Sequence, residues 1–375
     1  MRICTRTCTP PPCRTCPGAK TRCRRRGSTG ASGSCEEVAG MPIITYRQAL
    51  NDTLGEELAR DPNVLLMGEE IGVFQGSYRI TEGLLQEFGP KRVVDTPIAE
   101  EGFVGVAIGA AMLGLRPVVE IMTINFILVA IDQVVNHASK IHYMFGGQVR
   151  VPLVIRTPSG GTGQLAATHS QSFENWLAYC PGLKVVAPAT PYDAKGLLRA
   201  AIRDDDPVIF IESLALYDTK GEVPDDHDYV VPIGVAEVKR RGEDVTVVAY
   251  SRMTAIALQV AQRLENEGVS VEVIDLRSLR PLDRPTIIES VKKTGRAVVI
   301  AEDWYSYGVT AEIAATIQEQ AFDYLDAPVL RVAGLEVPLP YAKELSAVSK
   351  PNANSLIYAI RQVLAGTSRG AAWAK

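Results

Sequence analysis

Short apolar segments alternate with longer amphipathic segments along most of this chain, and that alternation is the strongest constraint on its fold. The apolar segments have the length of buried strands, and the first of them cover residues 63–68, 92–94, 117–122, 152–156, 184–187 and 207–212. Segments of helical length separate them, at residues 46–60, 79–88, 102–113, 126–143, 173–179 and 194–203. Apolar strands that alternate with helices predict a parallel sheet covered on both faces, and therefore an α/β fold.

A second alternation of the same kind follows a charged connector that contains proline. A chain of 375 residues exceeds what one hydrophobic core usually supports, so two domains are expected. We predict a larger domain at 41–220, a connector at 221–235 and a smaller α/β domain at 236–366. The remaining segments, 1–40 and 367–375, lie outside both domains.

Residues 1–40 differ from the rest in charge and cysteine content. They carry eight Lys/Arg and two Glu, whereas the remainder carries 31 Lys/Arg and 41 Asp/Glu. Six of the seven cysteines lie there, and Cys180 is the seventh. The pair Cys13-x-x-Cys16 has zinc-ligand spacing, but no second pair or histidine accompanies it. An Arg-rich segment with few acids also suits an organellar transit peptide. The interpretation we favour is a disordered or artefactual extension before Met41.

The composition of the remaining chain excludes several classes of function. Its net acidic charge offers no case for nucleic-acid binding. A single cysteine provides no disulfide framework and suits a reducing compartment. No stretch reaches the roughly 18 apolar residues that a membrane-spanning helix requires. Neither a nucleic-acid partner nor a membrane is therefore expected.

Glu100 is the first candidate for chemistry. It belongs to the segment Asp95-Thr-Pro-Ile-Ala-Glu-Glu-Gly102 and directly precedes an apolar run of helical length. Acids at the start of a helix commonly complement its partial positive charge, so this position alone does not distinguish a structural acid from a catalytic one. The same run places Gly102, Gly105 and Gly109 on one helix face, which suits a close contact with another subunit.

His169 is the best candidate for proton transfer among the four histidines of the chain. It follows the glycine-rich loop 159–163, and ligands in open parallel sheets bind beyond the carboxyl ends of strands. Glu69 follows the first strand at the same edge. The loop lacks the Lys-Ser/Thr ending of a P-loop and the spacing of a dinucleotide fingerprint, so it reads as a turn near the site.

Eight motifs, in order, give the chain from about Met41 to Gly366 a family resemblance. They are Leu66-Met-Gly-Glu-Glu70, Asp95-Thr-Pro-Ile-Ala-Glu100, Glu120-Ile-Met-Thr-Ile-Asn-Phe126, Ala130-Ile-Asp-Gln-Val-Val-Asn136, His169-Ser-Gln171, Cys180-Pro-Gly-Leu-Lys-Val-Val186, Asp275-Leu-Arg-Ser-Leu-Arg-Pro281 and Pro338-Leu-Pro-Tyr-Ala-Lys343. This region resembles the beta subunits of the thiamine-diphosphate-dependent decarboxylating component of 2-oxo acid dehydrogenase complexes, most closely the pyruvate type. The resemblance implies a transketolase-like fold, with a pyrimidine-binding domain followed by a C-terminal domain.

The resemblance also implies roles for individual residues. Glu100 would hydrogen-bond the aminopyrimidine ring of thiamine diphosphate, and Glu69 and Phe126 would line the cofactor pocket. His169 would orient the substrate or move protons during acyl transfer to a lipoyl group. A potassium ion would bind near Leu153, Ala201, Ile202, Asp204 and Asp206.

One motif of thiamine enzymes is absent. No Gly-Asp-Gly, which would hold the diphosphate through Mg²⁺, occurs in the sequence. The resemblance assigns that motif to an alpha subunit in an alpha2-beta2 heterotetramer, and it assigns docking of the lipoyl-bearing dihydrolipoyl acyltransferase to the second domain. The implied compartment is the cytoplasm in a bacterium, and the mitochondrial matrix or a plastid in a eukaryote.

Two departures from the family pattern leave alternatives open. Val129 replaces a polar residue of some pyruvate-type relatives, and Glu336 replaces the Asp usual before Pro-x-Pro-Tyr. Pyruvate is the expected substrate, with acetoin or a branched-chain 2-oxo acid as alternatives within the family. A non-catalytic α/β binding module is the alternative outside it.

Overall fold

The computed structural model describes residues 41–161 and 163–366, and the described residues from Pro42 to residue 366 belong to one compact unit. The expectations for residues 1–40 and 367–375 lie outside the described residues. Within the described ranges, no helix has the length and apolar character needed to span a membrane.

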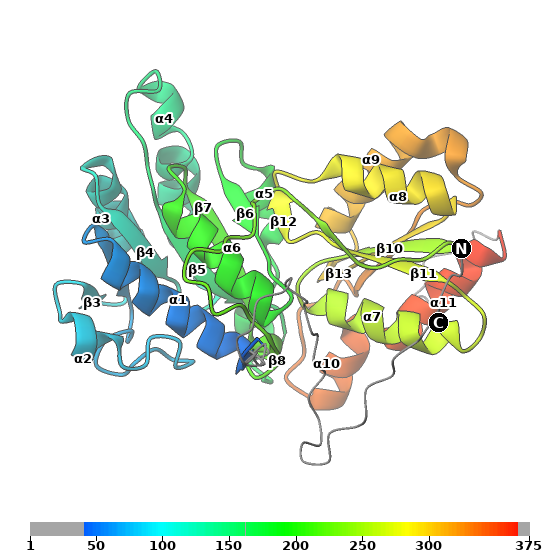
Figure 1. The fold of residues 1–375 in the computed structure, drawn as a ribbon, viewed down its shortest axis with the longest axis horizontal. Helices are drawn as coiled ribbons and strands as arrows, with labels where there is room; N and C mark the ends of the chain where they lie inside the picture. The colour runs from blue at the N-terminus through cyan, green and yellow to red at the C-terminus, as the bar shows by residue number, and fades with distance from the viewer. Residues whose placement is uncertain (1–40, 162, 367–375) are drawn as a thin grey trace, which may run out of the picture. The chain divides into compact units, whose positions relative to one another are not determined.

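The larger sheet has seven strands in the order β12-β6-β7-β5-β4-β2-β3 (Figure 1). All neighbouring pairs are parallel except β12 and β6, which are antiparallel. The strands are β2 (Val64–Gly68), β3 (Val93–Asp95), β4 (Arg116–Glu120), β5 (Val154–Ser159), β6 (Lys184–Val186), β7 (Val208–Ser213) and β12 (Ser278–Arg280). The predicted parallel α/β sheet is confirmed.

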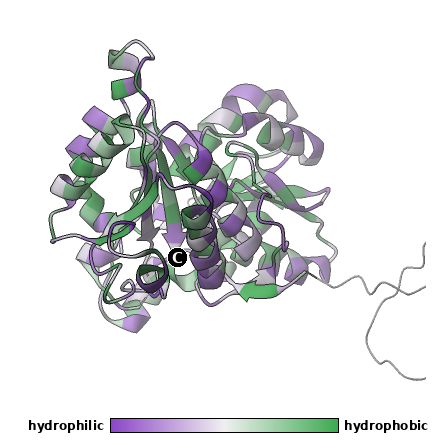
Figure 2. Cartoon of the chain, turned by 60° about the vertical axis from the view of Figure 1, so that its left-hand side comes forward, coloured by the Kyte–Doolittle hydropathy of each residue, from purple (hydrophilic) through white to green (hydrophobic). Residues whose placement is uncertain are grey.

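Helices cover both faces of this sheet, which explains why consecutive residues in the middle of its strands are apolar. Val118 of β4 packs in one hydrophobic cluster with helices α1 (Tyr46–Arg60) and α6 (Pro191–Arg203). Its neighbour Val119 packs in another, with α3 (Glu100–Met112) and α5 (Glu174–Tyr179). Successive side chains of a strand point to opposite faces, so both must be apolar when both faces are buried. Figure 2 shows hydrophobic residues concentrated on the central strands, while the covering helices are mixed.

The second sheet has five strands in the order β14-β13-β10-β11-β9. Its strands are β9 (Glu237–Arg240), β10 (Val245–Ala249), β11 (Val271–Asp275), β13 (Ala297–Trp304) and β14 (Leu330–Gly334). Val247 faces helices α7 (Arg252–Glu265) and α11 (Ala353–Leu364), and Val248 faces α8 (Arg284–Thr294) and α9 (Val309–Ala321).

The remaining elements are short. A two-stranded sheet pairs β1 (Ile43–Thr45) with β8 (Lys220–Glu222). The others are α2 (Leu84–Phe88), η1 (Ile124–Leu128), η2 (Gln133–Ala138), α4 (Ile141–Met144), η3 (Ala167–His169), η4 (Leu214–Leu216), η5 (Phe322–Tyr324) and α10 (Lys343–Ser349). Helix α2 is shorter than the predicted 79–88.

The two sheets are joined by more than the connector. Strand β12 follows β11 in the chain but pairs with β6 of the larger sheet. Close by, the fully buried Asp193 on α6 accepts a hydrogen bond from Lys239 at 2.8 Å and forms an ion pair with Arg277 at 2.6 Å, and both cations belong to the second half. A buried carboxylate needs such partners because it has lost its water. These contacts couple the two halves of the chain.

The predicted long helix at 126–143 is wrong. The structure instead has the 3₁₀ helix η1, the π-helix η2 and the short α4. The amide of Ser139 donates to the carbonyl of Val134, five residues back, and the Ser139 hydroxyl donates to Val135 O at 2.7 Å. The backbone bond across five residues is typical of π-helical segments. Apolar spacing does not distinguish such a turn from a regular α-helix.

Substitution of Gly182, which precedes β6 of the larger sheet, tests how closely this sheet packs against the irregular segment. Its φ is +97°, and a Cβ there would lie 2.0 Å from Ser139 O. We expect Gly182→Ala to lower the free energy of unfolding by about 3 kcal/mol or more, because backbone strain and a clash with backbone combine. Gly268→Ala is the matched control, since its φ is +80° and nothing lies within 4 Å. The control should lose only about 1 kcal/mol, and equal losses in urea denaturation would contradict the steric argument.

Candidate active site

The predicted site residues lie at the edge of the larger sheet where its parallel strands end. Glu69 directly follows β2, and Glu100 begins the helix that follows β3. Phe126 lies on η1 after β4, and His169 ends η3 after β5. Parallel pairing brings the carboxyl ends of these strands to one edge, which is where open α/β sheets bind ligands.

Glu69 and Glu100 form a pair of interacting buried carboxyl groups. Each is only 6% exposed, and Glu69 Oε1 has no hydrogen-bond partner among the described residues. Burial, with the nearby charge of Glu100, raises the pKa of Glu69 to about 7. An unpartnered buried oxygen beside a second carboxyl group suits a ligand with ring nitrogens and an amino group. The pair therefore fits the aminopyrimidine ring that the resemblance assigns to Glu100.

Phe126 and His169 form an aromatic pair at this edge. Their ring centroids are 5.1 Å apart and the rings are nearly perpendicular, with an interplanar angle of 86°. Phe126 is half-buried, whereas His169 is exposed, with its Nδ1 3.0 Å from the hydroxyl oxygen of Thr168. An exposed imidazole that packs against a fixed phenyl ring can exchange protons with a substrate that binds next to it.

A pair of side-chain amides holds these two segments together. Asn125 Nδ2 donates to Gln171 Oε1 at 2.8 Å, and the backbone amide of Gln171 donates to Asn125 Oδ1 at 3.3 Å. Asn125 precedes Phe126, and Gln171 lies two residues after His169. The two bonds therefore fix the backbone on both sides of the aromatic pair.

The segment before His169 has an unusual backbone. Gln164 and Ala166 have φ values of +55° and +62°. Such values cost residues with a side chain of the order of 1–3 kcal/mol, and they persist only where surrounding contacts impose them. Strained residues of this kind are frequent at functional sites. This strain gave no signal in the sequence, where the turn was predicted at 159–163 and nothing was predicted for Gln164 or Ala166.

The second half of the chain supplies contacts that hold this segment. Lys350 Nζ donates to Gly161 O, and Gln164 Nε2 donates to Tyr341 O at 3.3 Å. A Cβ on Gly161 would lie 2.3 Å from Leu339 Cδ2, so a larger residue there would require the Leu339 side chain to move. Sequence reasoning named the motif that contains Leu339 and Tyr341 but not its contact with this loop, because the two segments are more than 170 positions apart.

Arg156 and two glutamates lie in the strands that support the site. Arg156 Nη1 donates to Glu120 Oε2 at 2.6 Å, and Arg156 Nη2 lies 2.7 Å from Glu212 Oε1. Tyr217 donates to Glu212 Oε2 at 2.6 Å. All three charged residues are buried. Sequence reasoning did not identify this ion network, because each member is a single charge within an apolar strand.

The five residues predicted to bind potassium do lie near one another, but several of their oxygens have other partners. Arg116 Nη1 donates to Ile202 O at 3.1 Å and to Asp204 O at 2.8 Å, and Lys184 Nζ lies 3.1 Å from Asp206. The carbonyl of Leu153 accepts from Val208 N at 2.9 Å. Positive side chains thus already occupy part of this region. The potassium site stays a prediction.

No group of three or more His, Cys, Asp or Glu residues in the described ranges has an arrangement that could hold a metal ion. The hypothesis of zinc binding through Cys13 and Cys16 lies outside the described residues.

The glycine face of α3 is largely open in this single chain. A Cβ on Gly105 would lie 3.3 Å from Gln133 Oε1, whereas one on Gly109 would meet nothing within 4 Å. Beside them, Val106 and Leu113 are 61% and 88% exposed. Exposed apolar side chains flanking glycines on a helix mark a surface suited to another protein.

Comparison with known proteins identifies the family. Models of the transketolase pyrimidine-binding domain and the transketolase C-terminal domain match residues 43–220 and 234–356. The beta subunit of the pyruvate dehydrogenase E1 component from Rhizobium meliloti is 52% identical, over 86% of this chain and 70% of the relative. The same subunit from Rickettsia bellii is 51% identical, over 85% of this chain and 98% of the relative. The chain belongs to the family of pyruvate dehydrogenase E1 component beta subunits.

Further members of the E1 beta family match as extensively. The mitochondrial beta-1 subunit of Arabidopsis thaliana is 48% identical, over 92% of this chain and 95% of its own length. A split-gene transketolase solved as an inactive beta4 tetramer is similar in fold, with a TM-score of 0.70, 23% identity, and coverage of 87% of this chain and 99% of the other. The resemblance read from the eight motifs is confirmed.

The elevated pKa of Glu69 makes a prediction about stability. Its folded-state value of about 7 exceeds the ordinary 4.5, so the folded chain binds the proton more tightly than the unfolded chain between these pH values. Ionising Glu69 therefore destabilises the fold progressively as pH rises from about 4.5 to about 7. We expect Glu69→Gln to be more stable than wild type at pH 8 and to lose that advantage near pH 4.5. Urea denaturation at several pH values tests this, and the exposed neighbour in Glu70→Gln is the control. A difference between Glu69→Gln and wild type that does not vary with pH would contradict the assignment.

Proposed function

We propose that this chain is the beta subunit of a pyruvate dehydrogenase decarboxylating component. With an alpha subunit, it would decarboxylate pyruvate through thiamine diphosphate and transfer the acetyl group to the lipoyl group of a dihydrolipoyl acyltransferase. The observation that carries the proposal is the pair of buried, interacting carboxyl groups Glu69 and Glu100 at the strand ends, in a chain of this family.

Each site residue has a distinct task in this proposal. When bound, thiamine diphosphate supplies the carbon nucleophile and the electron sink that decarboxylation of a 2-oxo acid requires. Glu100 would hydrogen-bond a nitrogen of the aminopyrimidine ring and hold the proton shared with it. Glu69 and Phe126 would line the ring pocket and exclude water. His169 would orient the substrate or move a proton during acyl transfer.

The proposal makes this chain half of an active site. The sequence has no Gly-Asp-Gly, so Mg²⁺ and the diphosphate would be held by an alpha subunit, in an alpha2-beta2 assembly. The exposed glycine face of α3 supports such a partner, because this helix begins at Glu100. A protein bound there would lie next to the carboxyl pair. The acyltransferase would dock on the second half of the chain, and the predicted potassium ion would be structural.

Pyruvate is the substrate favoured over the alternatives. Curated relatives at about half identity carry the pyruvate dehydrogenase name. The segment Met122-Thr-Ile-Asn-Phe126 resembles the pyruvate type more than the branched-chain type, although acetoin enzymes share much of it. Acetoin or a branched-chain 2-oxo acid is the alternative within the family. A non-catalytic binding module would retain the fold without turnover.

The substrate can be tested directly with the assembled heteromer. We expect purified alpha and beta subunits, with thiamine diphosphate and Mg²⁺, to reduce an artificial electron acceptor when pyruvate is the substrate. The rate should be at least about tenfold above that with acetoin or a branched-chain 2-oxo acid, because a substrate pocket typically discriminates between side chains of different size by about this factor. Equal rates with a branched-chain acid would overturn the choice of pyruvate. No turnover with any of the three would favour the binding module.

Glu100 provides the second test of the function. Glu100→Gln removes the proton that the carboxyl group would share, so we expect pyruvate turnover to fall by about 10² to 10⁴-fold. Glu101→Gln is the matched control, because Glu101 is the next residue on α3 but is exposed. The control should keep wild-type activity. Turnover that survives Glu100→Gln unchanged would exclude the proposed role.

A further inference from the structure

The segment that carries His169 is closed at its base by one buried hydrogen bond. Ser159 is the last residue of β5 and Glu174 is the first residue of α5, so they mark the start and the end of the segment. The Ser159 hydroxyl lies 2.6 Å from Glu174 Oε1. A backbone bond from Gly160 N to Gln171 O, at 3.3 Å, lies just inside this pair. The position of His169 therefore depends on how these two ends are held.

We propose that Glu174 is a positioning residue for His169, because its bond with Ser159 ties together the two ends of the segment that carries the imidazole. This inference rests on the proposed function. Neither the domain matches nor the motif resemblance assigns a role to Glu174. Glu174 does not reach the aromatic pair, and it acts only by fixing the base of the segment.

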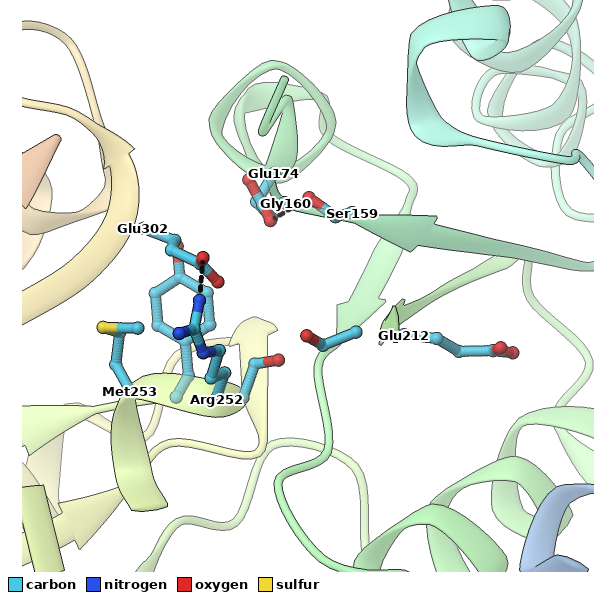
Figure 3. A pocket seen from close by; sticks show the side chains of 10 residues that line it. Ser159, Gly160, Glu174, Glu212, Arg252, Met253 and Glu302 are labelled. Atoms are coloured by element: carbon cyan, nitrogen blue, oxygen red, sulfur yellow. Dashed lines mark hydrogen bonds and ion pairs between the residues drawn. The ribbon is translucent and has the colours of Figure 1, made fainter. Parts of the chain in front are cut away.

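The surroundings of Glu174 show that it belongs to a small polar site. A cavity of about 10 Å³ is lined by Glu174 and Ser213 from the first half of the chain and by Tyr250 from the second. Glu174 Oε2, Ser213 Oγ and Tyr250 Oη are buried and have no hydrogen-bond partner among the described residues. The volume is close to what one water molecule needs, and three polar partners are enough to hold it. Figure 3 shows Glu174 and Ser159 together, with Arg252 and Glu302 nearby.

The charges around this cavity leave Glu174 without a cation of its own. Arg252, which lines the cavity, is paired with Glu302 at 2.7 Å. Asp303, on the same strand as Glu302, accepts from Val309 N at 2.6 Å. Glu212, on the remaining side, is held by Arg156. An unpaired buried charge is costly, so Glu174 is expected to stay neutral.

The proton on Glu174 follows from this environment. Burial raises the pKa of Glu174 to about 8, and the negative charges of Asp303 and Glu302 contribute to this increase. The hydrogen bond from Ser159 acts in the opposite direction and lowers this pKa. At neutral pH the carboxyl group is therefore mostly protonated and can bond both Ser159 and a water molecule in the cavity. Above pH 8 it ionises, and its negative charge then faces Asp303 and Glu302 on β13 of the second half. Repulsion between these carboxylates weakens the contact between the two halves of the chain. The position of His169 then becomes less well defined.

Two activities of the assembled heteromer distinguish this role from a general structural one. Pyruvate-dependent reduction of an artificial acceptor reports decarboxylation, and reductive acetylation of a lipoyl domain reports acyl transfer. His169→Ala sets the reference for how loss of the imidazole changes the ratio of the two. We expect Glu174→Ala to shift the ratio in the same direction and to lower the more affected activity by about tenfold, since small misplacements of a catalytic group are costly.

Two further variants complete the experiment. Ser159→Ala removes the same hydrogen bond from its other end without changing charge, and it should reproduce the shift even if Glu174→Ala fails to fold. Glu174→Gln keeps a polar partner for Ser159, so it should retain the wild-type ratio and abolish the change in ratio that wild type shows as pH rises through about 8.

The outcomes separate this inference from the proposed function. Equal loss of both activities in Ser159→Ala, or no loss in either, would overturn the positioning role. An alkaline change in Glu174→Gln that matches wild type would also overturn it. A wild-type heteromer without pyruvate activity would instead refute the proposed function.

Discussion

The buried ion network of Arg156 is the interaction on which the rest of the site depends. The parallel register places Arg156 of β5 beside Glu120 of β4, and Arg156 also reaches Glu212 of β7. Buried ion pairs contribute little net stability because desolvation offsets the attraction, but removal of one partner leaves an uncompensated charge. A shift in the pairing of these strands would separate the three groups. The network therefore favours a single alignment of the strand ends from which the Phe126 and His169 segments begin.

The candidate site needs both halves of the chain, although its predicted catalytic residues all lie in the first. Lys350 and Tyr341 contact the strained loop before His169, and Tyr250 and Arg252 line the cavity behind its base. The second half thus holds the loop in a conformation that its own sequence does not favour. The carboxyl pair is buried, but Glu100 begins α3, and the glycine face of that helix is open to another chain. This arrangement suits a cofactor that two subunits share.

Regular elements were predictable where a local pattern matched a local structure. Helix α1 begins and ends at the predicted residues, Tyr46 and Arg60, because its periodicity and its cap at Thr45 are both local. The prediction of one long helix at 126–143 was wrong, because the hydrogen bonds of the π-helical turn around Ser139 do not change the spacing of apolar residues. Strand β12 was also missed, because a three-residue strand exists only through its pairing with β6. Glu100 and His169 could be named as candidates because motifs surround them, and their roles stay predictions.

The sequence by itself determined the α/β class, the family, and which side chains are candidates for chemistry. These follow from features that are local or that recur as motifs: apolar runs, turn residues and short strings around Glu69, Glu100, Phe126 and His169. Only the tertiary structure decided which distant groups meet, such as Ser159 with Glu174 and Arg156 with its two glutamates. The pKa values of Glu69 and Glu174 were decided there as well, because burial and neighbouring charge, not residue type, raise them.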